Sequence, residues 1–215
     1  MTLLSALTEF FNSKGDITVK YVNQLEYPHV PYPTRVKEEP YAPNGIDSTV
    51  EQSGCGLCSV CMAVDILTDT TLDIEECVRI SMECGANHGT GTDMNVFGPV
   101  IAERFGLDYS KSCDLSEAIR HLREGGVIIA YMGVPEGKET GLFTKVGHYI
   151  LLVSTDDKEF CILDPNYSPE KFTIPEREGR VNTRNAPCLY CDVNTVDSET
   201  RPNRVKYFMF KRIKR

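Results

Sequence analysis

The amino-acid sequence predicts an α+β protein in which helices come first along the chain and strands follow. Between residues 55 and 124, apolar residues recur at helical spacing in segments separated by Gly-containing or polar stretches. Between residues 127 and 210, short apolar runs separated by turn residues are typical of antiparallel strands. Before both regions, the prolines at positions 28, 31, 33, 40 and 43 exclude regular structure from Tyr27 to Asn44.

The first part of the chain is predicted to be an N-terminal extension covering residues 1–45. Residues 2–13 have an amphipathic pattern that favours a helix, and Asp16 to Val22 alternate like a strand. The Pro-rich segment then forms an arm, and its composition leaves open whether the arm is flexible or wraps around the body. Residues 46–215 are predicted to form the main domain.

The main domain is predicted to contain four helices followed by five strands. Asp73 is a plausible N-cap of the second helix, and Gly106 stops the third. The helices are expected at Cys55 to about Leu67, about Leu72 to Cys84, Met94 to Phe105, and Asp114 or Leu115 to Glu124. The strands are expected at Val127–Met132, His148–Val153, Phe160–Leu163, Leu189–Val193 and Val205–Phe210.

Charge and cysteine content restrict the function classes. A formal net charge of −8 over 215 residues argues against binding to nucleic acid or to an anionic membrane, because either partner needs a basic face. No apolar run is long enough to span a bilayer, and the N-terminus lacks the basic region of a signal peptide. The nine cysteines are an odd number in a chain without an export signal, which predicts reduced thiols and a cytoplasmic location.

Three residues in a suitable order predict the chemistry. Cys55 lies where a polar, Gly-containing loop runs into an apolar helix, and the unpaired N–H groups of a helix start favour a thiolate. His148 opens a predicted strand, and Asp164 follows the next one. A nucleophile, a base that titrates near neutral pH and a carboxylate that orients the base are the parts of a cysteine hydrolase.

These motifs resemble the papain clan of cysteine peptidases, in particular the bacteriocin-type double-glycine leader peptidases and their stand-alone bacterial relatives, the C39-like peptidases. The resemblance covers about Gln52 to Pro165. It implies a papain-like fold with a helical lobe and an antiparallel sheet lobe. It also implies a peptide or protein substrate, an acyl-thioester intermediate and no cofactor. By this resemblance Cys55 is the nucleophile, His148 the general base and Asp164 its orienter.

The sequence departs from the family pattern at the glutamine that helps to bind the oxyanion. That glutamine normally lies six residues before the nucleophile, but Gln52 lies three before Cys55 and six before Cys58. Cys58 is therefore the alternative nucleophile. We favour Cys55 because the Cys-Gly pair and the helix register fit the stand-alone relatives better. Asn166 is the alternative to Asp164 as orienter, since papain itself uses an asparagine.

Two other function classes remain open at this point. The pairs Cys55/Cys58 and Cys188/Cys191 could supply four thiolates to a structural zinc ion. The chain could also be a non-catalytic binding module, because a fold does not guarantee an activity. The sequence does not distinguish peptide hydrolysis, isopeptide hydrolysis and transfer to another amine, which share one thioester mechanism.

Overall fold

The computed structural model describes residues 7–12, 15–34, 47–89, 91–202 and 204–213. Its centre is a seven-stranded antiparallel sheet with the strand order β5-β11-β6-β7-β8-β10-β9. These strands are β5 (Leu107–Ser112), β6 (Val127–Met132), β7 (His148–Thr155), β8 (Glu159–Leu163), β9 (Asn182–Asn185), β10 (Cys188–Asp192) and β11 (Tyr207–Arg212). The α+β class and the antiparallel sheet predicted from the sequence are confirmed.

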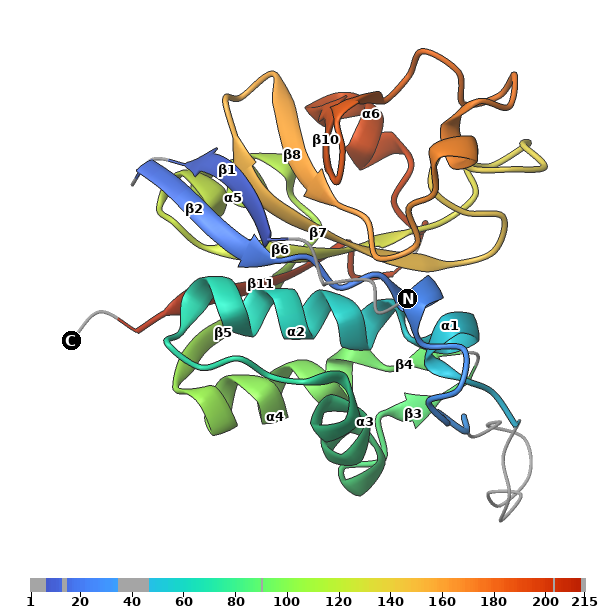
Figure 1. The fold of residues 1–215 in the computed structure, drawn as a ribbon. Coiled ribbons are helices and arrows are strands. Elements are labelled where there is room, and N and C mark those ends of the chain that lie inside the picture. Colours follow the sequence, from blue (N-terminus) through green and yellow to red (C-terminus); the bar gives the residue numbers. More distant parts are fainter. Residues whose placement is uncertain (1–6, 13–14, 35–46, 90, 203, 214–215) are drawn as a thin grey trace.

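Six α-helices in the described residues accompany the sheet. They are α1 (Val50–Ser53), α2 (Cys55–Leu67), α3 (Ile74–Glu83), α4 (Met94–Phe105), α5 (Leu115–Arg123) and α6 (Val193–Ser198). Figure 1 shows α2 running along one face of the sheet, with α3 and α4 beyond it. Two short 3₁₀ segments, η1 (Gln24–Glu26) and η2 (Pro169–Phe172), lie in the connecting chain. The helical lobe and the sheet lobe therefore meet along α2.

Both faces of the sheet are buried, because successive residues of a strand point to opposite sides. Ile129 and Leu151 belong to the cluster that includes the apolar residues of α2, α3 and α4. Ile128 and Ile150 belong to a second cluster, which includes residues of α5 and α6. This double coverage explains why β6 and β7 are nearly continuous apolar runs in the sequence.

The predicted helix boundaries follow from local capping. Asp73 accepts a hydrogen bond from the N–H of Glu76 at the start of α3, and Asp93 does the same for Asn95 at the start of α4. Gly106 ends α4 in the left-handed conformation, with φ of 63°, which glycine adopts without a steric penalty. The termination of the third predicted helix at Gly106 is thus confirmed.

The helix predicted for residues 2–13 is wrong where the structure describes it. Leu7–Asn12 form strand β1, which pairs antiparallel with β2 (Gly15–Lys20), with Leu7 opposite Lys20. The rest of the predicted helix lies outside the described residues. A short amphipathic segment satisfies helical and strand patterns almost equally, and pairing with the adjacent strand decides between them. The strand predicted for Asp16 to Val22 is confirmed as β2, although it ends at Lys20.

Smaller differences occur further along the chain. The strand predicted to end at Val193 ends at Asp192, because the side chain of Asp192 caps α6 by accepting the N–H of Thr195 at 2.8 Å. Strand β5 was not predicted; it pairs with β11 at one edge of the sheet. Its exposed, polar sequence gives little hydrophobic pattern, so pairing with β11 defines it.

The described part of the Pro-rich arm wraps around the body. Pro31 bridges to Thr49, and the N–H of Tyr32 donates to the carbonyl of Ser48 at 2.8 Å. The Tyr32 side chain is fully buried, and its hydroxyl lies 2.8 Å from Ser81 Oγ and 2.9 Å from Thr92 Oγ1. Residues 35–46 of the arm lie outside the described residues. The division of the chain at residue 45 stays a prediction.

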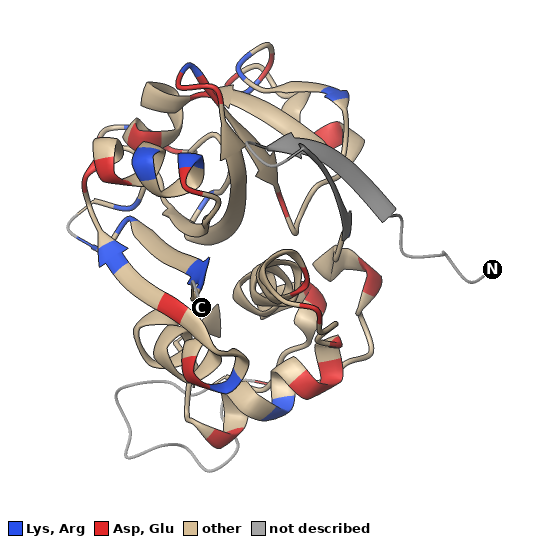
Figure 2. Cartoon of the chain, turned by 90° about the vertical axis from the view of Figure 1, so that its left-hand side faces the viewer, with Lys and Arg blue, Asp and Glu red and all other residues tan. Residues whose placement is uncertain are grey.

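Charged residues of both signs occur on the side of the molecule drawn in Figure 2. On α3, for example, Arg79 pairs with Glu76 and Glu83, and Arg104 of α4 also reaches Glu76. Within the described residues, no helix is both long and apolar enough to cross a membrane.

We expect Tyr32→Phe to lower the free energy of unfolding by about 1–3 kcal/mol, because it leaves buried hydroxyls of Ser81 and Thr92 without the phenol. Urea unfolding followed by circular dichroism measures this difference. Tyr131→Phe is a matched control, since no hydrogen bond of the Tyr131 hydroxyl occurs among the described residues. Equal stability of both variants would contradict the anchoring of the arm.

Candidate active site

Cys55 is the first residue of α2, and the glycines on either side of it make its position possible. A Cβ atom on Gly54 would lie 2.5 Å from the carbonyl oxygen of Val50. A Cβ on Gly56 would lie 2.9 Å from Thr92 Cβ and 3.3 Å from the ring of Tyr149. Gly54 therefore permits the tight junction between α1 and α2, and Gly56 lets the start of α2 approach both the β4 strand (Gly91–Thr92) and β7 closely. This approach places Cys55 beside the first residues of β7.

His148 and Asp164 are joined by a buried hydrogen bond. His148 opens β7, Asp164 directly follows β8, and these two strands are neighbours in the sheet. His148 Nε2 lies 2.7 Å from Asp164 Oδ1, and the side chains are 7% and 0% exposed. Because Asp164 engages Nε2, Nδ1 is the ring nitrogen left to interact with the thiol of Cys55, and this thiol–imidazole interaction shifts the pKa of both groups. The structure thus brings the three predicted residues together in the predicted order.

The environment shifts the pKa values of the thiol and the imidazole toward each other. Burial alone raises the pKa of Cys55, but the hydrogen bond and positive charge of His148, with main-chain N–H groups of Tyr149 and Gly56, lower it below the ordinary value. Burial and the charge of Lys171 lower the pKa of His148, but Asp164 and the contact with Cys55 outweigh them and raise it. Both shifts favour the thiolate–imidazolium pair.

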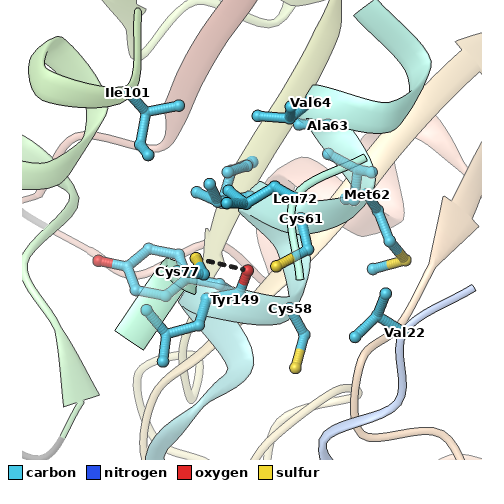
Figure 3. Close-up of a cluster of buried hydrophobic side chains, with 14 of the residues drawn as sticks. Val22, Cys58, Cys61, Met62, Ala63, Val64, Leu72, Cys77, Ile101 and Tyr149 are labelled. Carbon is cyan, nitrogen blue, oxygen red and sulfur yellow. Dashed lines mark hydrogen bonds between the residues drawn. The ribbon is translucent and has the colours of Figure 1, made fainter. Parts of the chain in front are cut away.

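Cys58, the alternative nucleophile, lies in the hydrophobic core. It is fully buried, and Figure 3 shows its side chain with those of Cys61 and Cys77 among apolar residues of the core cluster. Burial raises the pKa of Cys58 well above the ordinary value, and the neighbouring thiols Cys61 and Cys55 raise it further. Cys58 lies one turn after Cys55, so its thiol is neither at the helix start nor next to the imidazole of His148. Its surroundings therefore oppose thiolate formation.

The other two predicted residues occupy different positions. Gln52 lies in α1 with an exposed side chain, and its Oε1 accepts the N–H of Thr49 at 3.1 Å. No hydrogen bond between Gln52 and the thiol of Cys55 or the imidazole of His148 occurs among the described residues. The main-chain N–H of Asn166, rather than its side chain, takes part in the network by donating to Asp164 Oδ1 at 2.9 Å.

Lys171 joins the network although no feature of the sequence indicates it. Its Nζ lies 2.6 Å from Asp164 Oδ2, and its side chain is only 7% exposed. Charge from Lys171 and His148 overcomes the effect of burial and holds the pKa of Asp164 far below its ordinary range. Asp164 is therefore a carboxylate shared between two cations.

The N-terminal segment also contacts the site. The hydroxyl of Tyr21 donates to the carbonyl oxygen of Asp164, and the N–H of Gln24 donates to the carbonyl of Pro165 at 2.7 Å. The side chain of Gln24 donates to the carbonyl of Glu51 in α1. This segment links the loop that carries Asp164 to the helix preceding Cys55. Sequence patterns alone could not reveal this link, because the contacts join residues more than 25 positions apart.

The two CxxC pairs do not form a common metal site. Cys188 and Cys191 lie on β10, and the thiol of Cys191 donates to the carbonyl of Arg180 at 3.4 Å. Cys188 interacts with the thiol of Cys161 on the adjacent strand β8. Across the ranges that the structure describes, no three His, Cys, Asp or Glu side chains are grouped so that they could hold a metal ion.

Comparison with known proteins supports the fold. No protein-family model matches the sequence, and no curated protein matches it. Among solved structures, the chain is similar to the crystal structure of a candidate C39-like peptidase from Bacillus anthracis. The TM-score is 0.51 at 10% sequence identity, and the match covers 75% of this chain and 89% of that one. This similarity agrees with the resemblance found in the sequence: the chain has the fold of C39-like peptidases.

Proposed function

We propose that this chain is a cysteine peptidase or related amidohydrolase that cleaves a peptide or isopeptide bond. The observation that supports this best is the continuous contact from the Cys55 thiol through His148 to the buried Asp164. The three residues come from a helix start and from the ends of two adjacent strands. If Cys55 only packed in the core, it would not need His148 and Asp164 beside it. The likeness to a C39-like peptidase structure is consistent with this function.

In the proposed mechanism, the Cys55 thiolate attacks the carbonyl carbon of the scissile amide. The tetrahedral intermediate collapses to an acyl thioester on Sγ as the imidazolium of His148 gives its proton to the leaving amine. Neutral His148 then takes a proton from water, and the resulting hydroxide attacks the thioester and releases the acid. Asp164 holds Nε2 throughout and stabilises the imidazolium.

The oxyanion of the intermediate requires hydrogen-bond donors near Cys55. The main-chain N–H of Cys55 belongs to the first turn of α2, where helix N–H groups have no partner within the helix. Gln52 stays the predicted second donor. Its side-chain oxygen is used by the N–H of Thr49, so the NH₂ group would make this contact.

We further infer a peptide or protein substrate and a reducing, cytoplasmic location. All nine cysteines lie within the described residues, and none of these is in a disulfide. This state agrees with a compartment that keeps thiols reduced.

We expect Cys55 to react with iodoacetamide faster than any other cysteine near neutral pH, because its lowered pKa maintains the thiolate. The rate should fall as the pH drops through that pKa. In His148→Ala, Cys55 stays buried but loses the imidazolium that lowers its pKa. Labelling of Cys55 near pH 6 should therefore slow by about tenfold or more. Peptide mapping after timed labelling between about pH 5 and 9 measures both rates.

Cys113, which is exposed, is the internal reference for an accessible thiol, and Cys58→Ser tests the alternative nucleophile. Fast labelling should persist in Cys58→Ser. Labelling of Cys55 no faster than that of Cys113, and unaffected by loss of His148, would contradict the thiolate–imidazolium pair.

We expect p-nitrophenyl acetate to acetylate Cys55 with a burst of about one equivalent of p-nitrophenolate, followed by slower hydrolysis of the thioester. This small ester tests the chemistry without requiring knowledge of the natural substrate. Stopped-flow absorbance measures the burst, and mass spectrometry locates the acetyl group. Cys55→Ala should lose the burst while Cys113→Ala keeps it. A reactive Cys55 that forms no acyl-enzyme would instead support the non-catalytic binding module.

A further inference from the structure

We propose that Lys171 is a positioning residue of this site: its buried ammonium holds the second oxygen of Asp164 and offsets the charge of that carboxylate, so that His148 can both accept and release a proton. The proposal rests on the function proposed above. It assigns a role to a residue outside the Cys-His-Asp set.

Every side-chain oxygen of Asp164 has an assigned partner. Oδ1 accepts from His148 and from the N–H of Asn166, while Oδ2 faces Lys171 at 2.6 Å. The carboxylate is completely buried. Its orientation toward His148 is therefore fixed from both ends, and a rotation that broke the contact with His148 would also break the ion pair with Lys171.

Lys171 is held in place by its own surroundings. It lies in η2, where its N–H donates to the carbonyl of Ser168 at 3.1 Å. Its carbonyl accepts from Nη1 of the buried Arg177 at 3.3 Å, and Arg177 Nε also donates to the carbonyl of Gly141 at 3.1 Å. The ammonium also lies 5.8 Å from the centre of the Phe172 ring. A lysine on the surface would have none of these constraints.

Charge counting shows what the ammonium adds. In the reactive state the thiolate of Cys55 and the carboxylate of Asp164 are negative, and only the imidazolium of His148 is positive, so the three groups together carry one negative charge. Lys171 makes the set neutral. A buried charge without a partner costs several kcal/mol, and Asp164 is the acidic group that the structure places within ion-pair distance of Lys171.

The same balance bears on the reaction. The mechanism needs the imidazolium to give up its proton when the amine leaves and neutral imidazole to activate water afterwards. An uncompensated Asp164 would hold the imidazolium proton too strongly for the second step, and Lys171 weakens that hold. The charged or titratable groups around His148 are Cys55 from α2, Asp164 after β8 and Lys171 of η2. Tyr21 and Arg177 in turn interact with Asp164.

The test follows the ring of His148 by NMR in a Cys55→Ala background, which removes the coupled titration of the thiol. We expect Lys171→Met to raise the titration midpoint of His148 by about one pH unit, and Lys171→Arg, which keeps the charge, to restore it. An unchanged midpoint in Lys171→Met, or equal midpoints in Lys171→Met and Lys171→Arg, would overturn the proposal. If Lys171 had only a structural role, Lys171→Met would change the free energy of unfolding without changing the titration midpoint of His148.

If Lys171→Met does not fold because Asp164 is left unpaired, the comparison is made between Asp164→Asn and Asp164→Asn/Lys171→Met. Removal of the ammonium should again raise the midpoint, and no change would overturn the proposal. With Cys55 present, Lys171→Met should keep the p-nitrophenyl acetate burst but slow the later hydrolysis of the thioester near neutral pH. Raising the pH should restore the rate of this hydrolysis. An intact burst with unchanged hydrolysis contradicts the role of Lys171, whereas absence of the burst in the wild type contradicts the proposed function.

Discussion

The close contact between the first turn of α2 and strand β7 is the constraint on which the candidate site depends. Cys55 is on one side of this contact and His148 on the other, so their separation is set by how near the helix can come to the sheet. Gly56 permits that approach, because any side chain there would meet Thr92 and Tyr149. The ring of Tyr149 is in turn stacked on Tyr131, with centroids 4.7 Å apart, which fixes it against the sheet.

The buried polar network spreads this constraint through the chain. A buried carboxylate is tolerated only when its oxygens have partners, and the partners of Asp164 come from β7, the loop after β8 and η2. Tyr21 adds a hydrogen bond to its carbonyl from the N-terminal segment. The network therefore forms only when segments distant in sequence have docked, and an incomplete network would leave buried charge unpaired.

Residues whose partners are close in the sequence could be assigned a role from the sequence, whereas residues whose partners are distant could not. Asp73 and Gly106 determine helix ends through contacts within a few residues, so their positions could be inferred from the sequence. The order of the candidate site residues Cys55, His148 and Asp164 was also apparent, because each residue lies at the end of a predicted element. Lys171 was not, since only the path of the chain after Asp164 brings its ammonium back to that carboxylate. Likewise, β1 is defined by pairing with β2 rather than by its own pattern.

The difference between Cys55 and Cys58 shows how position along one helix turn governs thiol chemistry. Both belong to α2 and both are shielded from water to some degree. At the first position, the N–H groups of Gly56 and Tyr149 and the imidazole of His148 compensate for burial, so the anion is favoured. One turn later those groups are out of reach, neighbouring thiols replace them, and burial favours the neutral thiol. Burial alone therefore does not determine the pKa of a thiol; the deciding factor is whether the fold supplies a positive partner to the sulfur atom.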